Sequence, residues 1–336
     1  MRYSGKRVSI GSVLPKHRDI FRSVVNKYRD RKVLVIGHID ADLDYVSSGS
    51  AICGIPETKK WTFTIPEPIH PDITKTLTEM NMFYAPFDKI ITNDFEGVIV
   101  VDTNTPNLLP EKIFRWKRIL VIDHHLESDG VGAENEIIIP KADATARIVA
   151  ELLHSKEITP KMAIALATGI YTDTFQFSRM QDSETMAIYQ ELLRIADIKN
   201  EYIHQLSYPP ATEEEMRLMQ HILANNMNVV TYNGTLIAII KCPYEIARRT
   251  ILSLEKVFQI IILGTKINGS RLIKLRVRND FELNGARIMK EIGEQFNGSG
   301  GGHEKTAGCM GIGTLDEMIK EALTLVKERI TPSQPQ

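Results

Sequence analysis

Short, unbroken apolar runs recur along the first half of the chain, and each is bounded by polar or turn-forming residues. The runs are KVLVIG (32–37), VIVV (98–101), ILVI (119–122) and IIIP (137–140). Runs of this length and character are typical of strands buried on both faces of a parallel sheet. The sequence therefore predicts four such strands in this part of the molecule.

Helical patterns lie around these runs. They cover residues 18–28, residues 161–171 and the segment ADATARIVAELLHS, in which we expect Asp143 to be the N-cap and Ile148, Val149, Leu152 and Leu153 to share a face. Because strands alternate with helices, the fold class predicted for residues 17–205 is α/β with a mainly parallel sheet. Residues 1–16 are expected to form an N-terminal arm.

The pattern changes after Pro209 and Pro210. A connecting segment with one helix is predicted for residues 206–225, and strands are predicted at 228–232, 235–241, 257–263 and 272–278. Hairpin signals are Asn233-Gly234 and Asn268-Gly269, a helix follows at 285–295, and a capping box from Thr314 to Glu317 begins the last helix. We expect a smaller α+β domain over residues 226–330 and a disordered tail at 331–336.

Composition narrows the class of protein. The 336 residues include 41 basic and 42 acidic side chains, a net charge of −1, so no global positive field is present to hold long nucleic acid. The three cysteines form no CxxC pair, which argues against a disulfide framework and a zinc ribbon. No apolar run reaches the roughly 18 residues of a membrane span, and the first residues lack the apolar segment of a secretory signal. We therefore expect a cytoplasmic protein.

Acidic residues and histidines follow three of the predicted strands directly. The first strand leads into His38, Asp42 and Asp44, the second into Asp102, and the third into Asp123, His124 and His125. A further acid, Asp173, ends an apolar helical segment. Because ligands of parallel α/β sheets collect beyond the carboxyl ends of the strands, these groups are expected to meet in one crevice.

Several carboxylates in one crevice would repel each other unless cations bind there. Mixed oxygen and imidazole donors favour ions such as Mn²⁺ over calcium, and paired ions are a recurring device of phosphoester hydrolysis. Each motif alone has a structural reading, since HxxxDxD can be a helix cap and a single aspartate after a strand is usually a turn residue. Three consecutive strands ending in this way favour a shared metal site.

Together these motifs resemble the signature of the DHH phosphoesterases. The matching segments are His38-x-x-x-Asp42-x-Asp44, VVDT with Asp102, IDHH at 122–125 and TDT with Asp173, while Gly300-Gly301-Gly302-His303 resembles the GGGH motif of the associated C-terminal domain. The resemblance covers nearly the whole chain and is strongest to the nano-RNases, which degrade short oligonucleotides and often dephosphorylate adenosine 3′,5′-bisphosphate.

The resemblance implies a role for each of these residues. It implies two Mn²⁺ ions, with Mg²⁺ or Co²⁺ as substitutes: one held by His38 and Asp42, the other by Asp44, His124 and Asp173, and both bridged by Asp102. His125 would contact the scissile phosphate, and Asp123 would orient its neighbours.

A basic strand is expected to join the glycine motif in binding substrate. Glycines let backbone N–H groups approach a phosphate, and His303 adds a donor. Lys274, Arg276 and Arg278 alternate along IKLRVR and should share one face, which alone could be no more than a solvated surface. The resemblance implies that Arg276 contacts substrate phosphate, and Arg278 is a further candidate.

The chain departs from the family pattern at several positions. Leu43 and Phe175 stand where the family usually has glycine, Ser47-Ser48 replaces Gly-Ser, and Asn107 replaces an arginine. None of these changes removes an expected metal ligand, but they alter the pocket. Phe175 or Phe177 could stack on a base, although core packing is the commoner role of such residues.

The leading hypothesis is therefore a Mn²⁺-dependent phosphoesterase that releases nucleoside monophosphates from short oligonucleotides. Adenosine 3′,5′-bisphosphate, linear or cyclic dinucleotides and polyphosphate are alternative substrates, and a non-catalytic nucleotide sensor is the alternative from another class. We expect a short oligonucleotide or nucleotide as partner, with no long duplex and no membrane, and a homodimer is left open.

Overall fold

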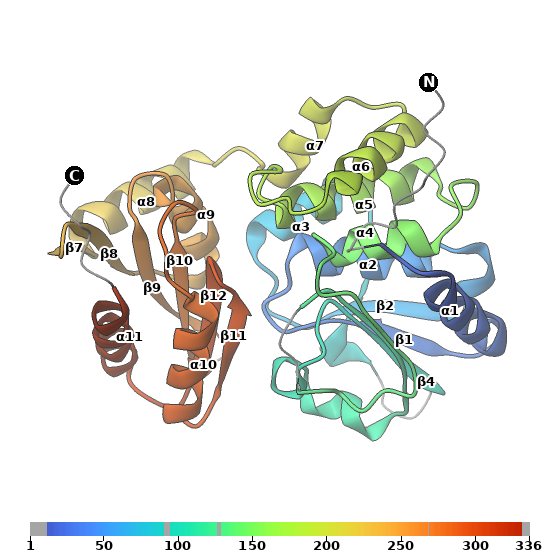
Figure 1. The fold of residues 1–336 in the computed structure, drawn as a ribbon, viewed down its shortest axis with the longest axis horizontal. Helices are drawn as coiled ribbons and strands as arrows, with labels where there is room; N and C mark the ends of the chain where they lie inside the picture. The colour runs from blue at the N-terminus through green and yellow to red at the C-terminus, as the bar shows by residue number, and fades with distance from the viewer. Residues whose placement is uncertain (1–11, 91–94, 126–128, 268, 331–336) are drawn as a thin grey trace. The chain divides into compact units, whose positions relative to one another are not determined.

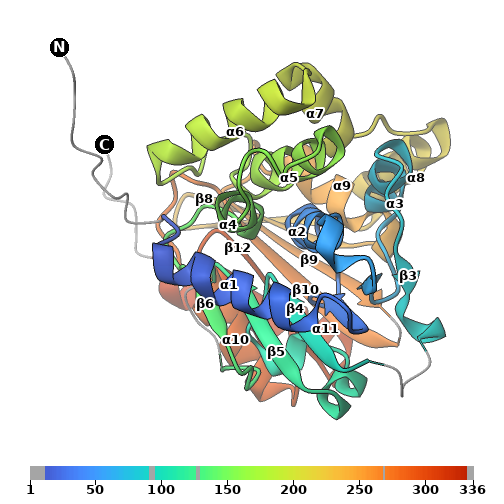
Figure 2. The same ribbon diagram turned by 90° about the vertical axis from the view of Figure 1, so that its right-hand side faces the viewer.

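The computed structural model describes residues 12–90, 95–125, 129–267 and 269–330. The predicted tail, most of the predicted arm, and Asn268 of the second hairpin signal lie outside these residues. The chain divides into two compact units, Met1–Pro209 and Pro210–Gln336, which are described separately below. Figures 1 and 2 show the elements of each unit.

The first unit is built on a sheet of parallel strands in the order β3-β2-β1-β4-β5-β6. Its strands are β1 (Val33–Ile36), β2 (Trp61–Ile65), β3 (Ala85–Pro86), β4 (Gly97–Val101), β5 (Arg118–Asp123) and β6 (Glu136–Ile138). The α/β class and the four predicted strands are confirmed. The sequence reading missed β2 and the two-residue β3.

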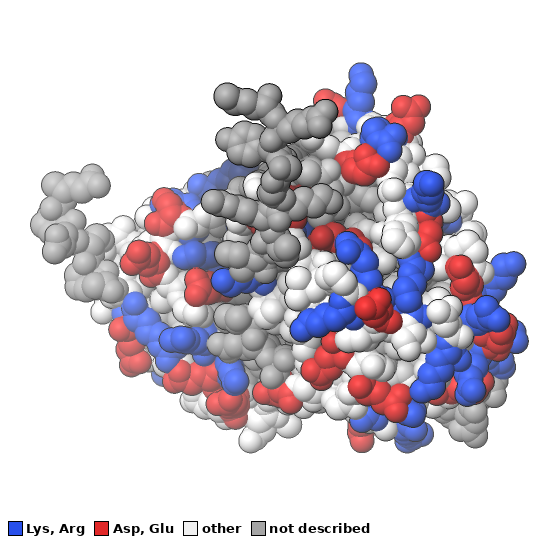
Figure 3. All heavy atoms as spheres, turned by 45° about the vertical axis from the view of Figure 1, so that its right-hand side comes forward, with Lys and Arg blue, Asp and Glu red and all other residues white. Residues whose placement is uncertain are grey.

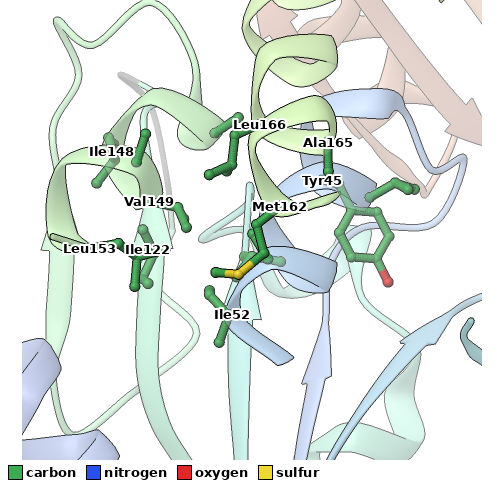
Figure 4. Close-up of a cluster of buried hydrophobic side chains, with 14 of the residues drawn as sticks. Tyr45, Ile52, Ile122, Ile148, Val149, Leu153, Met162, Ala165 and Leu166 are labelled. Carbon is green, nitrogen blue, oxygen red and sulfur yellow. The ribbon is translucent and has the colours of Figure 1, made fainter. Parts of the chain in front are cut away.

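Helices cover one face of this sheet. The helices of this unit are α1 (Pro15–Tyr28), α2 (Leu43–Cys53), α3 (Pro71–Glu79), α4 (Thr145–Leu152), α5 (Pro160–Asp173), α6 (Ser183–Ala196) and α7 (Asn200–Ser207). Figure 4 shows Ile122 of β5 beside Leu153, the residue that follows α4, with Val149 of α4 close by, and Met162 of α5 beside Ile52 of α2. Burying these side chains contributes the main free energy that fixes α2, α4 and α5 on the sheet.

The opposite face of the sheet is covered by short 3₁₀ turns and their connections. Leu34 of β1 and Val100 of β4 are fully buried there against a cluster that includes Phe87, Ile113 and Trp116. Strand residues are therefore buried on both faces, which explains why their sequences are apolar without alternation.

The predicted N-cap of α4 is wrong. The helix begins at Thr145, and the N-cap residue is Ala144, which offers no capping side chain. Asp143 instead accepts hydrogen bonds from the backbone N–H groups of Gln181 and Asp182 at 2.7 and 3.2 Å. This carboxylate thus holds the segment before α6 against the start of α4.

The second unit contains a mixed sheet in the order β11-β12-β10-β9-β8-β7. Its strands are β7 (Met227–Tyr232), β8 (Thr235–Lys241), β9 (Ile260–Ile267), β10 (Ser270–Val277), β11 (Ser299–His303) and β12 (Thr306–Gly311). All neighbouring pairs are antiparallel except β8 and β9, which are parallel and connected through a helix. The predicted Asn233-Gly234 turn is confirmed, since both residues have the positive φ that a tight hairpin requires.

Helices pack on both faces of the second sheet. They are α8 (Glu213–Asn225), α9 (Tyr244–Leu254), α10 (Gly285–Gln295) and α11 (Leu315–Arg329). α10 and α11 cover one face, and α8 and α9 cover β8 and β9 on the other. The capping box of Thr314 and Glu317 is confirmed, and α9 was not predicted. Because residues after α9 close its last turn, β9 begins at Ile260 and not at the predicted position 257.

None of the helices within the described residues combines the length and the hydrophobicity that a membrane span requires. On the face drawn in Figure 3, basic and acidic side chains are interspersed, which agrees with the near-zero net charge.

Candidate metal centre and substrate-binding face

The carboxyl ends of β1, β4 and β5 lie side by side, because β4 pairs with both of the other strands. Asp102 directly follows β4, His124 directly follows β5, and His38 stands two residues after the end of β1. Asp42 is the N-cap of α2, where its Oδ1 accepts the N–H groups of Asp44 and Tyr45 at 3.0 Å each. The strand order thus brings the predicted residues into one cluster.

The cluster consists of two groups of metal-ligating side chains. His38, Asp42 and Asp102 form one, and Asp44, His124 and Asp173 form the other; within each group the ligand atoms lie within 4.8 Å of one another. Asp102 faces both groups. Its Oδ2 lies 3.5 Å from Nε2 of His38, while its Oδ1 lies 3.6 Å from Nε2 of His124.

Backbone carbonyl groups orient both histidines. Nδ1 of His38 donates to the carbonyl oxygen of Ile39 at 2.9 Å, and Nδ1 of His124 donates to that of Ala142 at 3.1 Å. With the proton placed on Nδ1, each Nε2 presents a lone pair to the acids. Burial lowers the pKa of His124, which favours the neutral imidazole that a metal requires.

The charged forms of Asp44, Asp102 and Asp173 are destabilised by burial and by neighbouring acids, whereas the pKa of Asp42 is lowered, because its burial is outweighed by the charge of His38 and a backbone hydrogen bond. Burial and then the charge of Asp173 raise the pKa of Asp44 to about 7, and burial and then Asp42 raise the pKa of Asp173 to about 7. Burial together with the neighbouring acids raises the pKa of Asp102 well above its usual range. A divalent cation would remove this repulsion, so the donor set and its electrostatics both fit a metal ion.

Asp123 has a different environment from the other acids. Its Oδ1 accepts from Nδ1 of His125 at 2.7 Å and from the backbone N–H groups of His124 and His125 at 2.8 and 3.2 Å. Although burial alone would lower the pKa of His125, the charge of Asp123 raises it to about 9. His125, a quarter exposed, is therefore a cation at neutral pH.

The turn after Asp173 has an unusual backbone. Phe175, Gln176 and Phe177 all have positive φ, at 51, 58 and 65°. Such conformations are costly for residues other than glycine and persist only where their surroundings impose them. Phe177 packs in the core, with its ring centroid 4.8 Å from that of Tyr189.

Phe175 is half-buried and has a cationic neighbour. Cζ of Arg179 lies 3.6 Å from the centroid of the Phe175 ring, and the charge of Arg179 also acts on Asp173. The sequence reading missed Arg179. A signal for it existed, because it is a lone cation six residues after the expected ligand Asp173.

The remaining departures from the family pattern have simple placements. Leu43, Ser47 and Ser48 are buried within α2, whereas Asn107 is exposed in the 3₁₀ turn Pro106–Leu108. Leu43 therefore contributes to the core and leaves the ligands unchanged.

In the second unit, cross-strand register places the basic residues beside the glycine motif. Lys274 pairs with Gly308, which pairs with Gly301, and Arg276 pairs with Thr306, which pairs with His303. Paired residues share a face of the sheet, so Lys274, Arg276, Gly301 and His303 lie on one face. Arg278 lies beyond the end of β10 and binds Asp280 through two hydrogen bonds of 2.6 and 3.0 Å.

The glycine motif forms strand β11 and is not a loop. A Cβ on Gly300 would lie 1.8 Å from the carbonyl oxygen of Met289, so the packing of α10 requires glycine there. Gly302 has a φ of 118°, which favours glycine for a conformational reason. At Gly301 a Cβ would meet no atom within 4 Å, so this position leaves the strand backbone open.

Comparisons with known proteins agree with this arrangement. Residues 32–170 match the model of the DHH family, N-terminal domain, and residues 245–331 match that of the DHHA1 domain. The chain is 24% identical over 303 residues to the bifunctional oligoribonuclease and PAP phosphatase NrnA of Mycoplasma pneumoniae, covering 83% of this chain and 87% of that protein.

A second curated relative is matched over a shorter part. The cyclic-di-AMP phosphodiesterase GdpP of Bacillus subtilis is 27% identical over 172 residues, which is 46% of this chain and 26% of that protein. Among solved structures, an exopolyphosphatase-related protein of Bacteroides fragilis superposes with a TM-score of 0.73 at 20% identity, covering 97% of this chain and 99% of that one. This likeness establishes the fold.

Proposed function

Since the chain belongs to the DHH family of phosphoesterases, we propose that it hydrolyses short oligonucleotides to nucleoside monophosphates with two Mn²⁺ ions. It is a phosphoester hydrolase by family, and the finer assignment rests on its own residues. One observation carries it: the two carboxylate oxygens of Asp102 face two separate groups of ligands, as a carboxylate bridging two ions requires.

The proposed ligands divide between the two groups. His38 and Asp42 would hold one ion, Asp44, His124 and Asp173 the other, and Asp102 both. When bound, the ions supply positive charge that stabilises the charge developing on the phosphate oxygens. The mixed carboxylate and imidazole donors favour Mn²⁺, with Mg²⁺ and Co²⁺ as substitutes.

His125 is the proposed phosphate contact of the protein itself. Its ring is partly exposed, and Asp123 keeps it protonated at neutral pH. A protonated imidazole can donate a hydrogen bond to a phosphate oxygen or a proton to the leaving oxygen. Asp123 acts through His125 as a positioning residue.

The second unit is proposed to bind the rest of the substrate. Lys274, Arg276 and His303 place positive charge and hydrogen-bond donors on the face where Gly301 leaves the strand backbone open. Such a surface suits a short chain of phosphates. The neutral net charge argues against long duplexes as substrates.

A second candidate is removal of the 3′-phosphate from adenosine 3′,5′-bisphosphate, which the description of the Mycoplasma relative favours.

The test is an activity panel in Mn²⁺ with a labelled five-mer, adenosine 3′,5′-bisphosphate, a cyclic dinucleotide and polyphosphate. We expect mononucleotides from the five-mer with the wild type and none with Asp102→Ala. The exposed Asp88 provides the matched control Asp88→Ala, which should retain activity. No cleavage of the five-mer by metal-loaded wild type would overturn the proposal.

A further inference from the structure

Thr145, the first residue of α4, contacts two of the acids in the metal cluster. Its hydroxyl donates a hydrogen bond to Oδ1 of Asp102 at 2.8 Å, and its backbone N–H donates to Oδ2 of Asp44 at 2.7 Å. The next N–H, of Ala146, donates to the other oxygen of Asp44 at 2.7 Å. These acids lie 43 and 101 residues before Thr145, so the contacts are tertiary.

The first turn of α4 explains why Asp44 is held so firmly. The N-cap Ala144 has no side chain that could satisfy the first N–H groups of the helix. The carboxylate of Asp44, on α2, takes that role from outside. The N–H groups of Thr145 and Ala146 both donate to this carboxylate, which lies at the positive end of the dipole of α4. Both effects favour the ionised form of Asp44.

Close packing fixes this contact. Gly169 of α5 lies where α2 and α4 meet: a Cβ there would lie 2.7 Å from Cβ of Ala146, 3.0 Å from Cβ of Ser47 and 3.2 Å from Oδ1 of Asp44. The absence of a side chain at Gly169 therefore allows α2 and α4 to approach each other. Thr145 is completely buried and has no freedom to move away from the acids.

Asp102 needs such a fixed partner. Its φ is 61°, a left-handed conformation that costs on the order of 1–3 kcal/mol for a residue other than glycine. The backbone therefore turns the carboxylate toward the cluster, and the Thr145 hydroxyl sets its rotation about the side-chain bonds. The oxygen that Thr145 contacts is the one that faces His124.

We infer that Thr145 is a positioning residue that aligns Asp102 with Asp44 and so sets the affinity of the site for metal. The inference rests on the metal site of the proposed function. It assigns Thr145 no contact with substrate. The hydroxyl is the part that can be removed without disturbing the helix, since the N–H contacts to Asp44 belong to the backbone.

The test is Mn²⁺ binding measured by calorimetry without substrate. Thr145→Val removes the hydroxyl and keeps the shape of the side chain, and we expect its affinity to fall by about 10- to 100-fold. Thr145→Ser keeps the hydroxyl and should bind within a few-fold of wild type. The control is Thr168→Val in α5. Thr168 is also buried, and its hydroxyl donates to the backbone carbonyl of Ile164. Removing this hydroxyl should leave the affinity for Mn²⁺ unchanged.

Circular dichroism shows whether each variant folds. If Thr145→Val does not fold, Thr145→Ala replaces it as the variant that lacks the hydroxyl. Equal affinity of wild type and the folded hydroxyl-lacking variant would overturn the role of Thr145. Absence of Mn²⁺ binding by the wild type would instead overturn the metal site, so the two failures are distinguishable.

Discussion

Nδ1 of His125 lies 2.7 Å from Oδ1 of Asp123, a side chain that is completely buried at the end of β5. The pair is a short, charge-assisted hydrogen bond between a partly exposed cation and a buried anion. Burial alone would raise the pKa of Asp123, but His125 and the backbone N–H groups lower it below its usual range. The buried acid therefore maintains a positive charge at the rim of the cluster.

Replacing Asp123 with Asn should change the pH dependence of hydrolysis. The raised pKa of His125, about 9, depends on the charge of Asp123, so without that charge it should fall toward its ordinary value of 6.5. The alkaline limb of kcat/KM should then move about 2 pH units toward acid. His125→Gln should lower kcat by about 10²- to 10⁴-fold. An alkaline limb that stays in place in Asp123→Asn would show that this pair does not set the protonation state.

Stability of the metal-free protein should depend on Asp173. Burial, and then the charge of Asp42, raise its pKa from the ordinary 3.8 to about 7 in the folded state, so protonation favours folding. The contribution is present below about pH 4 and lost as the pH rises through 7. Asp173→Asn, which cannot ionise, should therefore be more stable than wild type at pH 8, on the order of 2–4 kcal/mol, with little difference near pH 4. Urea unfolding in EDTA measures this, and a variant less stable than wild type at pH 8 would contradict it.

Arg179 and Phe175 should contribute to substrate binding. Because the guanidinium carbon lies 3.6 Å from the centroid of the Phe175 ring and its charge acts on Asp173, we expect it to be held where it can contact a phosphate. Arg179→Gln should raise KM for a five-mer about tenfold, equivalent to about 1.4 kcal/mol, with kcat largely retained. The control Arg194→Gln removes an exposed arginine that binds Glu191 on α6 and should have no effect. Equal KM values for the two variants would exclude Arg179 from binding.

Arg276 and Arg278 form a matched pair in the second unit. Arg276 shares its face with His303 and lies 4.0 Å from the carboxylate of Glu255, whereas Arg278, beyond the end of β10, forms two hydrogen bonds with Asp280. Arg276→Ala should raise KM at least tenfold with unchanged metal affinity, and Arg278→Ala less than threefold. Steady-state kinetics on the five-mer provides both values. A larger effect at Arg278 would reverse the assignment.

Most residues of the metal cluster could be predicted because they follow a strand closely in the sequence, whereas Asp173 ends helix α5 and was found through its motif. An apolar run marks β1, β4 or β5, and the polar residue behind it marks the carboxyl end where strands meet. Contacts between distant segments could not be read in this way. The cap of α4 was misassigned because its first N–H groups bind Asp44 of α2, and no local pattern contains that contact.

Two further features also depended on tertiary structure. The left-handed turn at 175–177 contains no glycine, so residue preferences give no sign of it. Strand β2 has the sequence WTFTI, in which threonine alternates with larger residues, yet four of its five positions are buried. Its packing beneath α2, with Phe63 against Tyr45, sets this burial and is not visible in the local pattern.

The central claim is that His38, Asp42, Asp44, Asp102, His124 and Asp173 hold two divalent ions. The most direct measurement is anomalous diffraction at the manganese edge from crystals grown with Mn²⁺. We predict two peaks, one in each group of ligands and both within coordination distance of Asp102, with both peaks lost or weakened in Asp102→Ala. Wild-type crystals with no anomalous peak at this cluster, or with manganese bound only elsewhere, would contradict the account.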